Sequence, residues 1–245
     1  MKYRLDSHAH TIASGHAYNT INEMVKAAAE KGLELLALTE HTKMLPGTCH
    51  ELYFMNLKVL PRKMQGIEVL FGAEVNIMDY EGKLDMRPEL MKKMDVCIAS
   101  LHLPCITPGT VAENTNALVK AVENPLVNII GHPDDGRYPV DYDTLVAAAK
   151  EHHVLVELNN SSMNPKGSRT NAREADIKIL ELCEKYHAPI IMNSDAHWAG
   201  DVGNTCYSMP LIREVGFPEQ LIVNRSVEEY KKYINRYKNA DTTLQ

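Results

Sequence analysis

Histidines and acidic residues occur in this sequence in short motifs that could bind metal ions. His8 and His10 form an H-x-H pair near the N-terminus, and His16 follows them in the same segment. The later motifs each place a histidine or a carboxylate after an apolar run: His41, Glu74, His102, His132, Asp195 and His197. Neutral imidazole and carboxylate are ligands that zinc, manganese and iron bind in proteins. The residue types therefore predict a metal centre.

An H-x-H pair alone is a weak signal. In an extended segment, alternate side chains lie on the same side, so His8 and His10 could bind one ion together. Two loop histidines held by hydrogen bonds would have the same spacing. Seven of the 11 histidines lie just beyond the ends of apolar runs, which favours metal binding. The other four lie near expected helix ends or in an irregular stretch, and we expect them to be solvated or structural: His50, His152, His153 and His187.

Seven segments are candidate β-strands, and the six after the first are apolar runs of the length expected for buried strands. They cover residues 3–6, 33–38, 69–73, 96–99, 127–130, 154–158 and 190–192. Helix signals lie between several of them: capping boxes at Thr20 with Glu23 and at Thr110 with Glu113, and an N-cap at Asp141 or Asp143. Strands joined by helices run parallel, so their carboxyl ends meet on one face. The pattern predicts an α/β fold in which all the candidate ligands share one rim.

Length and composition favour one compact unit. A chain of 245 residues with 44% hydrophobic residues can bury a substantial core, and this length suits one α/β barrel better than two domains. We therefore expect a single domain over residues 1–245. Helical periodicity over residues 227–237 predicts a last helix that closes the barrel, before a polar tail.

Charge and composition also restrict the kinds of molecule that the protein could bind. The net charge of −6 offers no basic field for nucleic acid, which points to a small substrate. No apolar run reaches the length of a membrane span, and the N-terminal segment lacks the apolar stretch of a secretion signal. The five cysteines form no C-x-x-C pair, so we expect reduced thiols, with Cys105 as a small buried thiol. These features predict a cytoplasmic protein that needs no membrane and could form a homo-oligomer.

The order of the motifs resembles that of a known superfamily. The segments DSHAHT, TEH, GAE, SLH, GHP and NSDAH are similar to those of the PHP superfamily of polymerase-associated domains and histidinol phosphatases. The segments HAYNT, ELNNSS and KGS resemble its short bacterial phosphatases of the YcdX type. The resemblance covers most of the chain. It implies an α/β fold with a distorted seven-stranded (β/α)7 barrel and a trinuclear metal centre.

The resemblance also distributes nine ligands over three divalent ions, with zinc as the first choice and manganese or iron as alternatives. It forms three groups: His8, His10 and Asp195; His102 and His132, joined to the first group by a bridging Glu74; and His16, His41 and His197. Two positions depart from the pattern, since Glu40 stands where relatives often carry aspartate and Asp134 where the close group tends to have glycine. Neither change removes a ligand. Asp6 and Glu40 could orient ligand imidazoles or simply be solvated.

The predicted centre indicates a reaction. Seven neutral imidazoles and two carboxylates around three divalent cations leave a first shell of about +4, which selects anions. A phosphate monoester suits such a site, and we expect the nucleophile to be a metal-bound hydroxide held by Glu74, Asp195, His8 and His10. No G-x-S-x-G elbow, Walker loop or G-x-G-x-x-G fingerprint is present. The sequence therefore favours a metal-dependent phosphoesterase.

Several residues are candidates for binding the substrate phosphate: Arg169, Lys166, Asn160, Ser161 and Ser162, with Arg62 and Tyr18 as weaker ones. An ordinary surface arginine and a packed tyrosine would explain Arg62 and Tyr18 nearly as well. Two other classes stay open. One is an amidohydrolase that cleaves a C–N bond, although its bridging modified lysine has no evident counterpart here. The other is a metal-binding accessory domain without catalysis, although no polymerase is attached and the ligand set is full.

Overall fold

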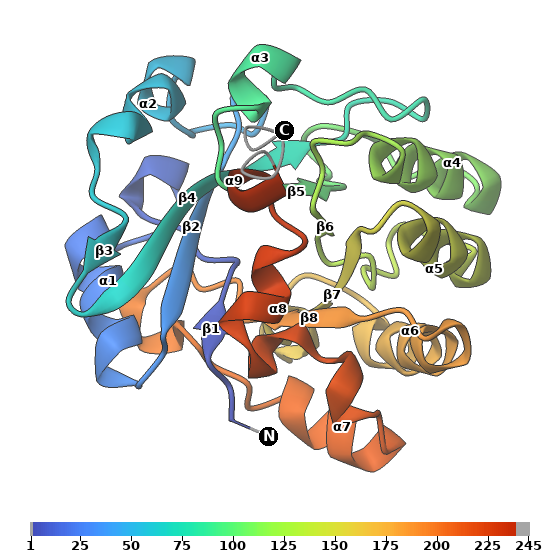
Figure 1. Ribbon diagram of the computed structural model, residues 1–245. Coiled ribbons are helices and arrows are strands. Elements are labelled where there is room, and N and C mark those ends of the chain that lie inside the picture. The colour runs from blue at the N-terminus through green and yellow to red at the C-terminus, as the bar shows by residue number, and fades with distance from the viewer. Residues whose placement is uncertain (1, 239–245) are drawn as a thin grey trace, which may run out of the picture.

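The computed structural model describes residues 2–238. Within them, seven parallel strands form a nearly closed barrel (Figure 1). The strands, in their order around the barrel, are β1 (Leu5–Asp6), β2 (Leu35–His41), β4 (Ile67–Asn76), β5 (Cys97–Ser100), β6 (Ile129–Ile130), β7 (Leu155–Asn159) and β8 (Ile190–Asn193). A short strand, β3 (Lys63–Met64), pairs antiparallel with the start of β4. The predicted α/β barrel with seven parallel strands is confirmed.

Helices follow most strands and lie outside the barrel; α4, α5 and α6 form a row on one side of it (Figure 1). The described helices are α1 (Ile21–Glu30), α2 (Glu51–Asn56), α3 (Pro88–Met91), α4 (Val111–Val122), α5 (Tyr142–Glu151), α6 (Ala172–Tyr186), α7 (Ser208–Val215), α8 (Val227–Lys231) and α9 (Asn235–Lys238). Both predicted capping boxes are present, at the starts of α1 and α4, and Asp141 rather than Asp143 caps α5. None of the helices described is both long enough and apolar enough to cross a membrane.

The strands bury side chains on both faces. Their outward-facing residues pack against the surrounding helices, while Leu35, Leu70 and Leu155 belong to a separate cluster inside the barrel. Tyr230 of α8 and Ile234 are buried in this inner cluster, so the C-terminal segment covers one end of the barrel. The apolar interior therefore occupies the amino-terminal part of the strands and leaves their carboxyl ends for polar side chains.

The C-terminal segment differs from the single helix expected over residues 227–237. The chain forms α8 and α9, separated by a turn at residues 232–234. Ile234 and Asn235 are both buried, and the amide of Asn235 donates to the carbonyl oxygen of Leu126 at 2.9 Å. The helix is interrupted because the chain must bend to bring both side chains against the barrel. The expected polar tail, residues 239–245, lies outside the described residues.

Closure between the first and last strands uses a side chain in place of a strand ladder. The amide of Asn224 donates to the carbonyl oxygens of Leu5 in β1 and Met192 in β8, at 3.0 and 2.6 Å, and its Oδ1 accepts from the Met192 N–H at 2.7 Å. Further along, Ala9 and Ala196 form an isolated parallel bridge. This bridge brings the segment with the H-x-H pair beside the segment that follows β8.

Candidate metal centre

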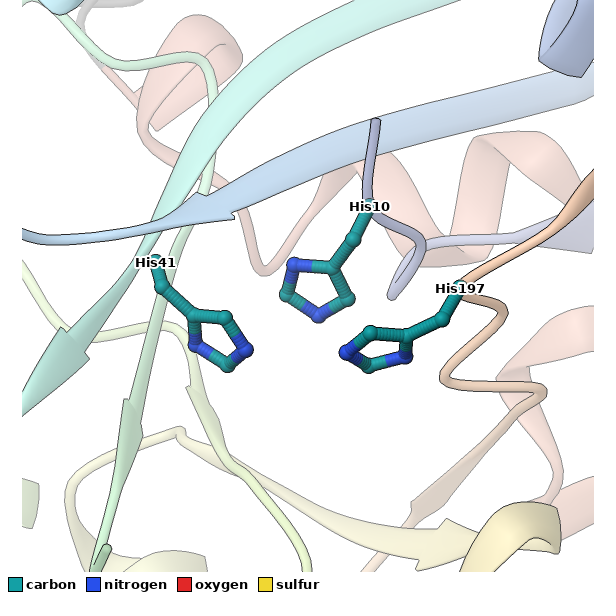
Figure 2. A group of neighbouring side chains, drawn as sticks. All are labelled: His10, His41 and His197. Carbon is teal, nitrogen blue, oxygen red and sulfur yellow. The ribbon is translucent and has the colours of Figure 1, made fainter. Parts of the chain in front are cut away.

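All nine predicted ligands lie at the carboxyl end of the barrel. Their elements are the segment after β1 for His8, His10 and His16; the ends of β2 and β4 for His41 and Glu74; and the loops after β5, β6 and β8 for His102, His132, Asp195 and His197. His10, His41 and His197 come from three different elements and their rings face a common space (Figure 2). The fold thus brings together residues that are up to 189 positions apart in the sequence, such as His8 and His197.

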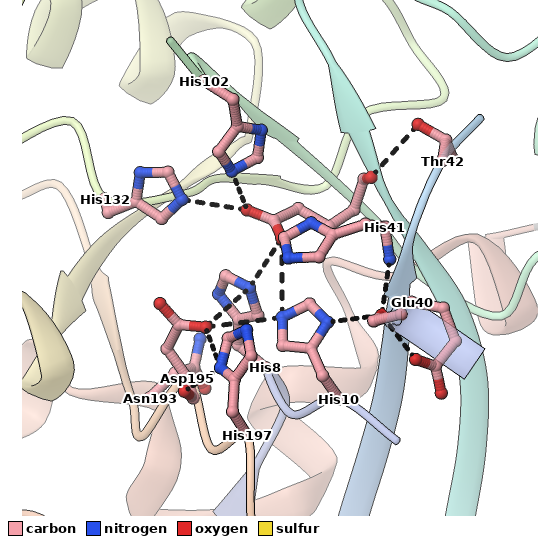
Figure 3. A network of polar contacts seen from close by, with 12 residues as sticks. His8, His10, Glu40, His41, Thr42, His102, His132, Asn193, Asp195 and His197 are labelled. Carbon is pink, nitrogen blue, oxygen red and sulfur yellow. Dashed lines mark hydrogen bonds and ion pairs between the residues drawn. The ribbon is translucent and has the colours of Figure 1, made fainter. Parts of the chain in front are cut away.

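The carboxylate of Glu74 lies at the middle of this group and is fully buried. Its Oε1 lies 2.9 Å from His132 Nε2 and 3.3 Å from His102 Nε2. Figure 3 shows the rings of His102 and His132 as parts of one network of polar contacts. Glu74 Oε2 lies 2.7 Å from His41 Nδ1 and 3.3 Å from His8 Nε2. Each carboxylate oxygen thus faces a different set of imidazoles. That arrangement suits a carboxylate that bridges two metal ions.

A second carboxylate, Asp195, lies on the other side of the histidine pair. Its Oδ1 is 3.6 Å from His8 Nε2, 3.4 Å from His10 Nε2 and 3.6 Å from His197 Nδ1. His197 in turn places its Nε2 3.0 Å from Nε2 of His16. Three groups of donor atoms lie close enough together to hold one ion each: His10 with His41 and His197; His8 with His10 and Glu74; and His41 with Glu74 and His102.

Several donor atoms of the site are buried and make no hydrogen bond of acceptable geometry within the described residues. They are His8 Nε2, His10 Nε2, His41 Nδ1 and Glu74 Oε2, although the last two lie 2.7 Å apart. Burying a polar atom without a partner costs about 1–3 kcal/mol, so four such atoms facing one space would be destabilising if nothing bound there. Imidazole nitrogens and carboxylate oxygens in this arrangement fit divalent cations.

Burial and mutual charge favour neutral imidazoles at His10 and His41 and an ionised carboxylate at Glu74, the protonation states that metal binding needs. Burial lowers the pKa of His41 to about 4 and also lowers the pKa of His10 well below its usual value. Burial alone would raise the pKa of Glu74, but the neighbouring His41, His8 and His102 outweigh it and hold that pKa well below the usual range. His8 is the exception, because Glu157, Glu74 and Asp195 raise its pKa against the effect of burial.

Hydrogen bonds from the second ring nitrogens fix the orientation of the imidazoles. His8 Nδ1 lies 2.7 Å from Oε1 of Glu157, and His102 Nδ1 lies 2.7 Å from Oδ1 of Asn76. His10 Nδ1 lies 3.1 Å from Oγ of Ser14, whose hydroxyl donates to Glu40 at 2.6 Å. Such outer partners set the tautomer and the ring direction of metal-ligating histidines.

The two acidic residues proposed as orienting partners have different surroundings. Glu40 reaches His10 through Ser14, as described above. The carboxylate of Asp6 accepts from the hydroxyl and N–H of Ser194 and from the N–H of Gly203, and so holds the loop that carries Asp195. Glu157, which contacts His8 directly, was not singled out from the sequence, although a charged residue inside the apolar run VLVELNN is the signal that could have found it.

Two of the candidate ligands have strained backbone. His132 has φ 30° and Asp195 has φ 53°, in the left-handed region that side chains other than glycine rarely adopt. Each such residue costs on the order of 1–3 kcal/mol and persists only where the surroundings enforce it. The N–H of His132 donates to Glu157 Oε2 at 2.7 Å, which is one such restraint. Strain at these two positions is consistent with a functional site.

A pocket of about 570 Å³ opens from the candidate ligands towards solvent. Arg169 and Ser161 line it, together with Arg137, which was not singled out from the sequence. The Arg169 guanidinium donates to Asp195 Oδ2 at 3.1 and 3.2 Å and to Ser162 Oγ at 3.1 Å. Arg169 is therefore the candidate phosphate-binding residue nearest to the histidine cluster.

The remaining phosphate-binding candidates lie outside the pocket lining. The side chain of Asn160 accepts from the N–H groups of Tyr207 and Ser208 and anchors the start of α7. Lys166 and Tyr18 are exposed. The structure does not bring Arg62 to the site, because its guanidinium lies near the amino-terminal end of β4 and β5, over the ring of Phe71 and 2.7 Å from Asp95.

Comparisons with known proteins agree with the geometry. A family model described as the PHP domain matches residues 6–240. A probable phosphatase of Caldicellulosiruptor saccharolyticus is 45% identical and aligns with 96% of this chain and 97% of its own length. A probable phosphatase of Clostridium botulinum is 42% identical over the full length of both chains. A solved histidinol phosphate phosphatase from Lactococcus lactis, complexed with zinc, L-histidinol and phosphate, has a TM-score of 0.63 at 20% identity and covers 88% of this chain and 95% of its own.

Glu157→Gln tests the role of the outer hydrogen bonds. Because the amide cannot fully replace a carboxylate as the partner of His8 and of the His132 N–H, we expect the affinity for divalent metal to fall about 10- to 100-fold. Competition with a chelator, followed by elemental analysis, measures the change. Glu181→Gln on α6, an exposed glutamate, is the matched control. Equal metal retention in both variants would show that Glu157 does not support the centre.

Proposed function

The chain belongs to the PHP domain family and is a metal-dependent phosphatase, and on that premise we propose that it hydrolyses a small-molecule phosphate monoester at a centre of three divalent ions. Residues 1–245 would form one domain. Zinc is the proposed metal, because it is the ion present in the structurally similar Lactococcus lactis enzyme, and the donor set suits it. A cytoplasmic location and a homo-oligomeric state stay predictions.

The observation that carries this proposal is the set of buried donor atoms without partners around Glu74. Its two oxygens face different imidazoles, His102 and His132 on one side and His8 and His41 on the other. We assign a bridging role to this carboxylate. Divalent cations bound there would neutralise phosphate charge and acidify the water that attacks phosphorus.

The chain's own residues would orient the substrate. Arg169 is held by Asp195 and Ser162, and at 16% exposure its side chain still reaches the pocket. A planar guanidinium can contact two phosphate oxygens at once. The side chains of His8, His10 and Glu74 are fully buried, and charge interactions are stronger at such depth than in water. The pocket volume of about 570 Å³ suits a small ester.

The alternative classes receive less support. An amidohydrolase of the kind considered above bridges its metals through a modified lysine, but the described pocket lining contains no lysine, and the carboxylate of Glu74 occupies the central place. A purely structural accessory domain would not need Arg169 and Arg137 beside the ligand cluster. The phosphatase relatives, aligned over nearly their whole length, favour catalysis.

A substrate panel tests the proposed function. The metal-loaded protein is incubated with phosphomonoesters, phosphodiesters and amides, and release of phosphate, alcohol or amine is assayed. Hydrolysis confined to monoesters is the expected result, because a dianionic phosphate gains most from a cationic centre. Cleavage of amides with no release of phosphate would favour the amidohydrolase class instead.

Metal content provides a separate prediction. Elemental analysis should find close to three divalent ions per chain, and Glu74→Gln should lower the occupancy of more than one position because one side chain faces two groups of imidazoles. His152→Ala, an exposed histidine at the end of α5, should keep the full content. A saturated sample with one ion per chain would contradict the trinuclear proposal.

Arg169→Ala should lower kcat/KM for phosphomonoesters by roughly 10- to 150-fold, the effect of losing a hydrogen bond to a charged group. Metal content is measured alongside, since Arg169 also contacts Asp195. Lys166→Ala is the matched control, because Lys166 is exposed and lies outside the pocket lining. An unchanged kcat/KM in the arginine variant at normal metal content would assign phosphate binding to another residue.

A further inference from the structure

Arg137 lines the same pocket as the metal ligands but lies on a different loop from Arg169. It follows β6, whereas Arg169 follows β7. Its Nε donates to both oxygens of Asp135, at 2.9 and 3.0 Å, and its Nη2 donates to Asp135 Oδ2. Within the described residues its Nη1 has no hydrogen-bond partner. One edge of the guanidinium is therefore occupied and another is available to a ligand.

Exposure distinguishes the two members of this ion pair. The side chain of Arg137 is 27% exposed, whereas that of Asp135 is 4% exposed. Both residues line the pocket, and the guanidinium presents the larger exposed surface to a ligand there. Asp135 keeps the planar group in a fixed orientation, which reduces the side-chain entropy lost when a ligand binds.

The backbone on both sides of Arg137 is also fixed. The N–H of Gly136 donates to the carbonyl oxygen of Thr170 at 2.8 Å, and a Cβ at position 136 would lie only 2.4 Å from that oxygen, so the close approach requires glycine. The buried Tyr138 donates its hydroxyl to the Ile106 carbonyl oxygen at 2.8 Å. Arg137 thus stands between two anchored neighbours, on a loop tied to the loop of Arg169.

The charges of the pocket are distributed unevenly. Its apolar lining residues are Leu45, Pro46, Leu101, Leu103 and Pro104. The lysine or arginine side chains among the described lining residues are Arg137 and Arg169, and the carboxylates are their ion-pair partners Asp135 and Asp195. The hydrogen bond with Asp135 raises the pKa of Arg137, while burial and, less strongly, the nearby charge of Arg169 oppose that effect. An anionic group beside Arg137 would relieve this repulsion.

We propose that Arg137 binds a second anionic group, a carboxylate or another phosphate, on the leaving group of the substrate. This inference rests on the proposed phosphatase function, in which Arg169 and the metal centre receive the reacting phosphate. It defines a substrate class: small phosphate monoesters that carry a further negative charge and an apolar or neutral part that can contact the leucine and proline side chains of the lining. Arg137 is then a specificity residue, and Asp135 positions it.

Matched substrate pairs test the proposal on the unmodified, metal-loaded protein. Glycerol phosphate is compared with phosphoglycerate, and phenyl phosphate with its para-carboxylated analogue, so that each pair differs in one carboxylate. We expect kcat/KM to be at least about 10-fold higher for the carboxylated member of one pair or both, mainly through a lower KM. Equal values within both pairs would overturn the proposal.

Variants then assign the preference to one residue. Arg137→Ala should reduce the ratio of kcat/KM within the preferred pair to near unity, and Arg137→Lys, which keeps the charge but not the planar fork, should leave an intermediate ratio. Arg173→Ala removes an arginine that is paired with Glu214 on the surface, and should keep the ratio. An Arg137→Ala variant that slows both members equally would place this residue on the reacting phosphate and overturn the proposal.

Binding measurements separate this inference from the proposed function. Calorimetry with the metal-loaded protein reports the affinity for each ligand of a pair without turnover. If no monoester is hydrolysed, the phosphatase proposal fails; a preference for the carboxylated ligand that Arg137→Ala abolishes would still support the anion site. Should Arg137→Ala fail to fold, as shown by thermal unfolding, the comparison of the unmodified protein with Arg137→Lys decides the question.

Discussion

The buried carboxylate of Glu74 is the feature on which the end of the barrel depends. Five imidazoles lie within 3.5 Å of its two oxygens, those of His8, His10, His41, His102 and His132. A charge at this depth is costly unless it is compensated, and several of the surrounding nitrogens also lack partners. Cations in this space would satisfy the carboxylate and the imidazoles together. At this place in the described part of the chain, metal binding can offset the cost of burying His8 Nε2, His10 Nε2 and the Glu74 carboxylate.

The barrel supports this arrangement by dividing its interior into two layers. Leu35, Leu70 and Leu155 fill the end of the barrel at which the strands begin, together with Tyr230 of α8. Figure 1 shows α8 at the centre of the ring of strands. Closer to the carboxyl ends of the strands, Glu74 follows Leu70 in β4 and Glu157 follows Leu155 in β7, on the same inner face. Apolar packing inside the barrel thus fixes the strands that carry the polar side chains. This support can sustain the backbone strain at His132 and Asp195.

The polar layer extends outward from the imidazoles to the pocket. Glu157 binds His8, the N–H of His132 and the side chain of Asn193, so one carboxylate links the segments after β1 and β6 to the last residue of β8. Asp195 joins the histidines to Arg169. Metal centre and anion-binding side chains are therefore parts of one connected network, and a change in either would be felt by the other.

The sequence by itself determined the fold class, the two capping boxes and the set of candidate ligands, because strand patterning, helix caps and ligand types are local properties of the chain. The sequence does not identify Glu157 or Arg137 as residues of the site, and it wrongly offers Arg62 as a phosphate-binding candidate. The reason is that a residue's partners depend on which loops the barrel brings together. The break between α8 and α9 likewise follows from packing Ile234 against the inner cluster. Only the tertiary structure decided which polar atoms face one another without partners, since burial and distance between segments far apart in sequence are set by closure of the barrel.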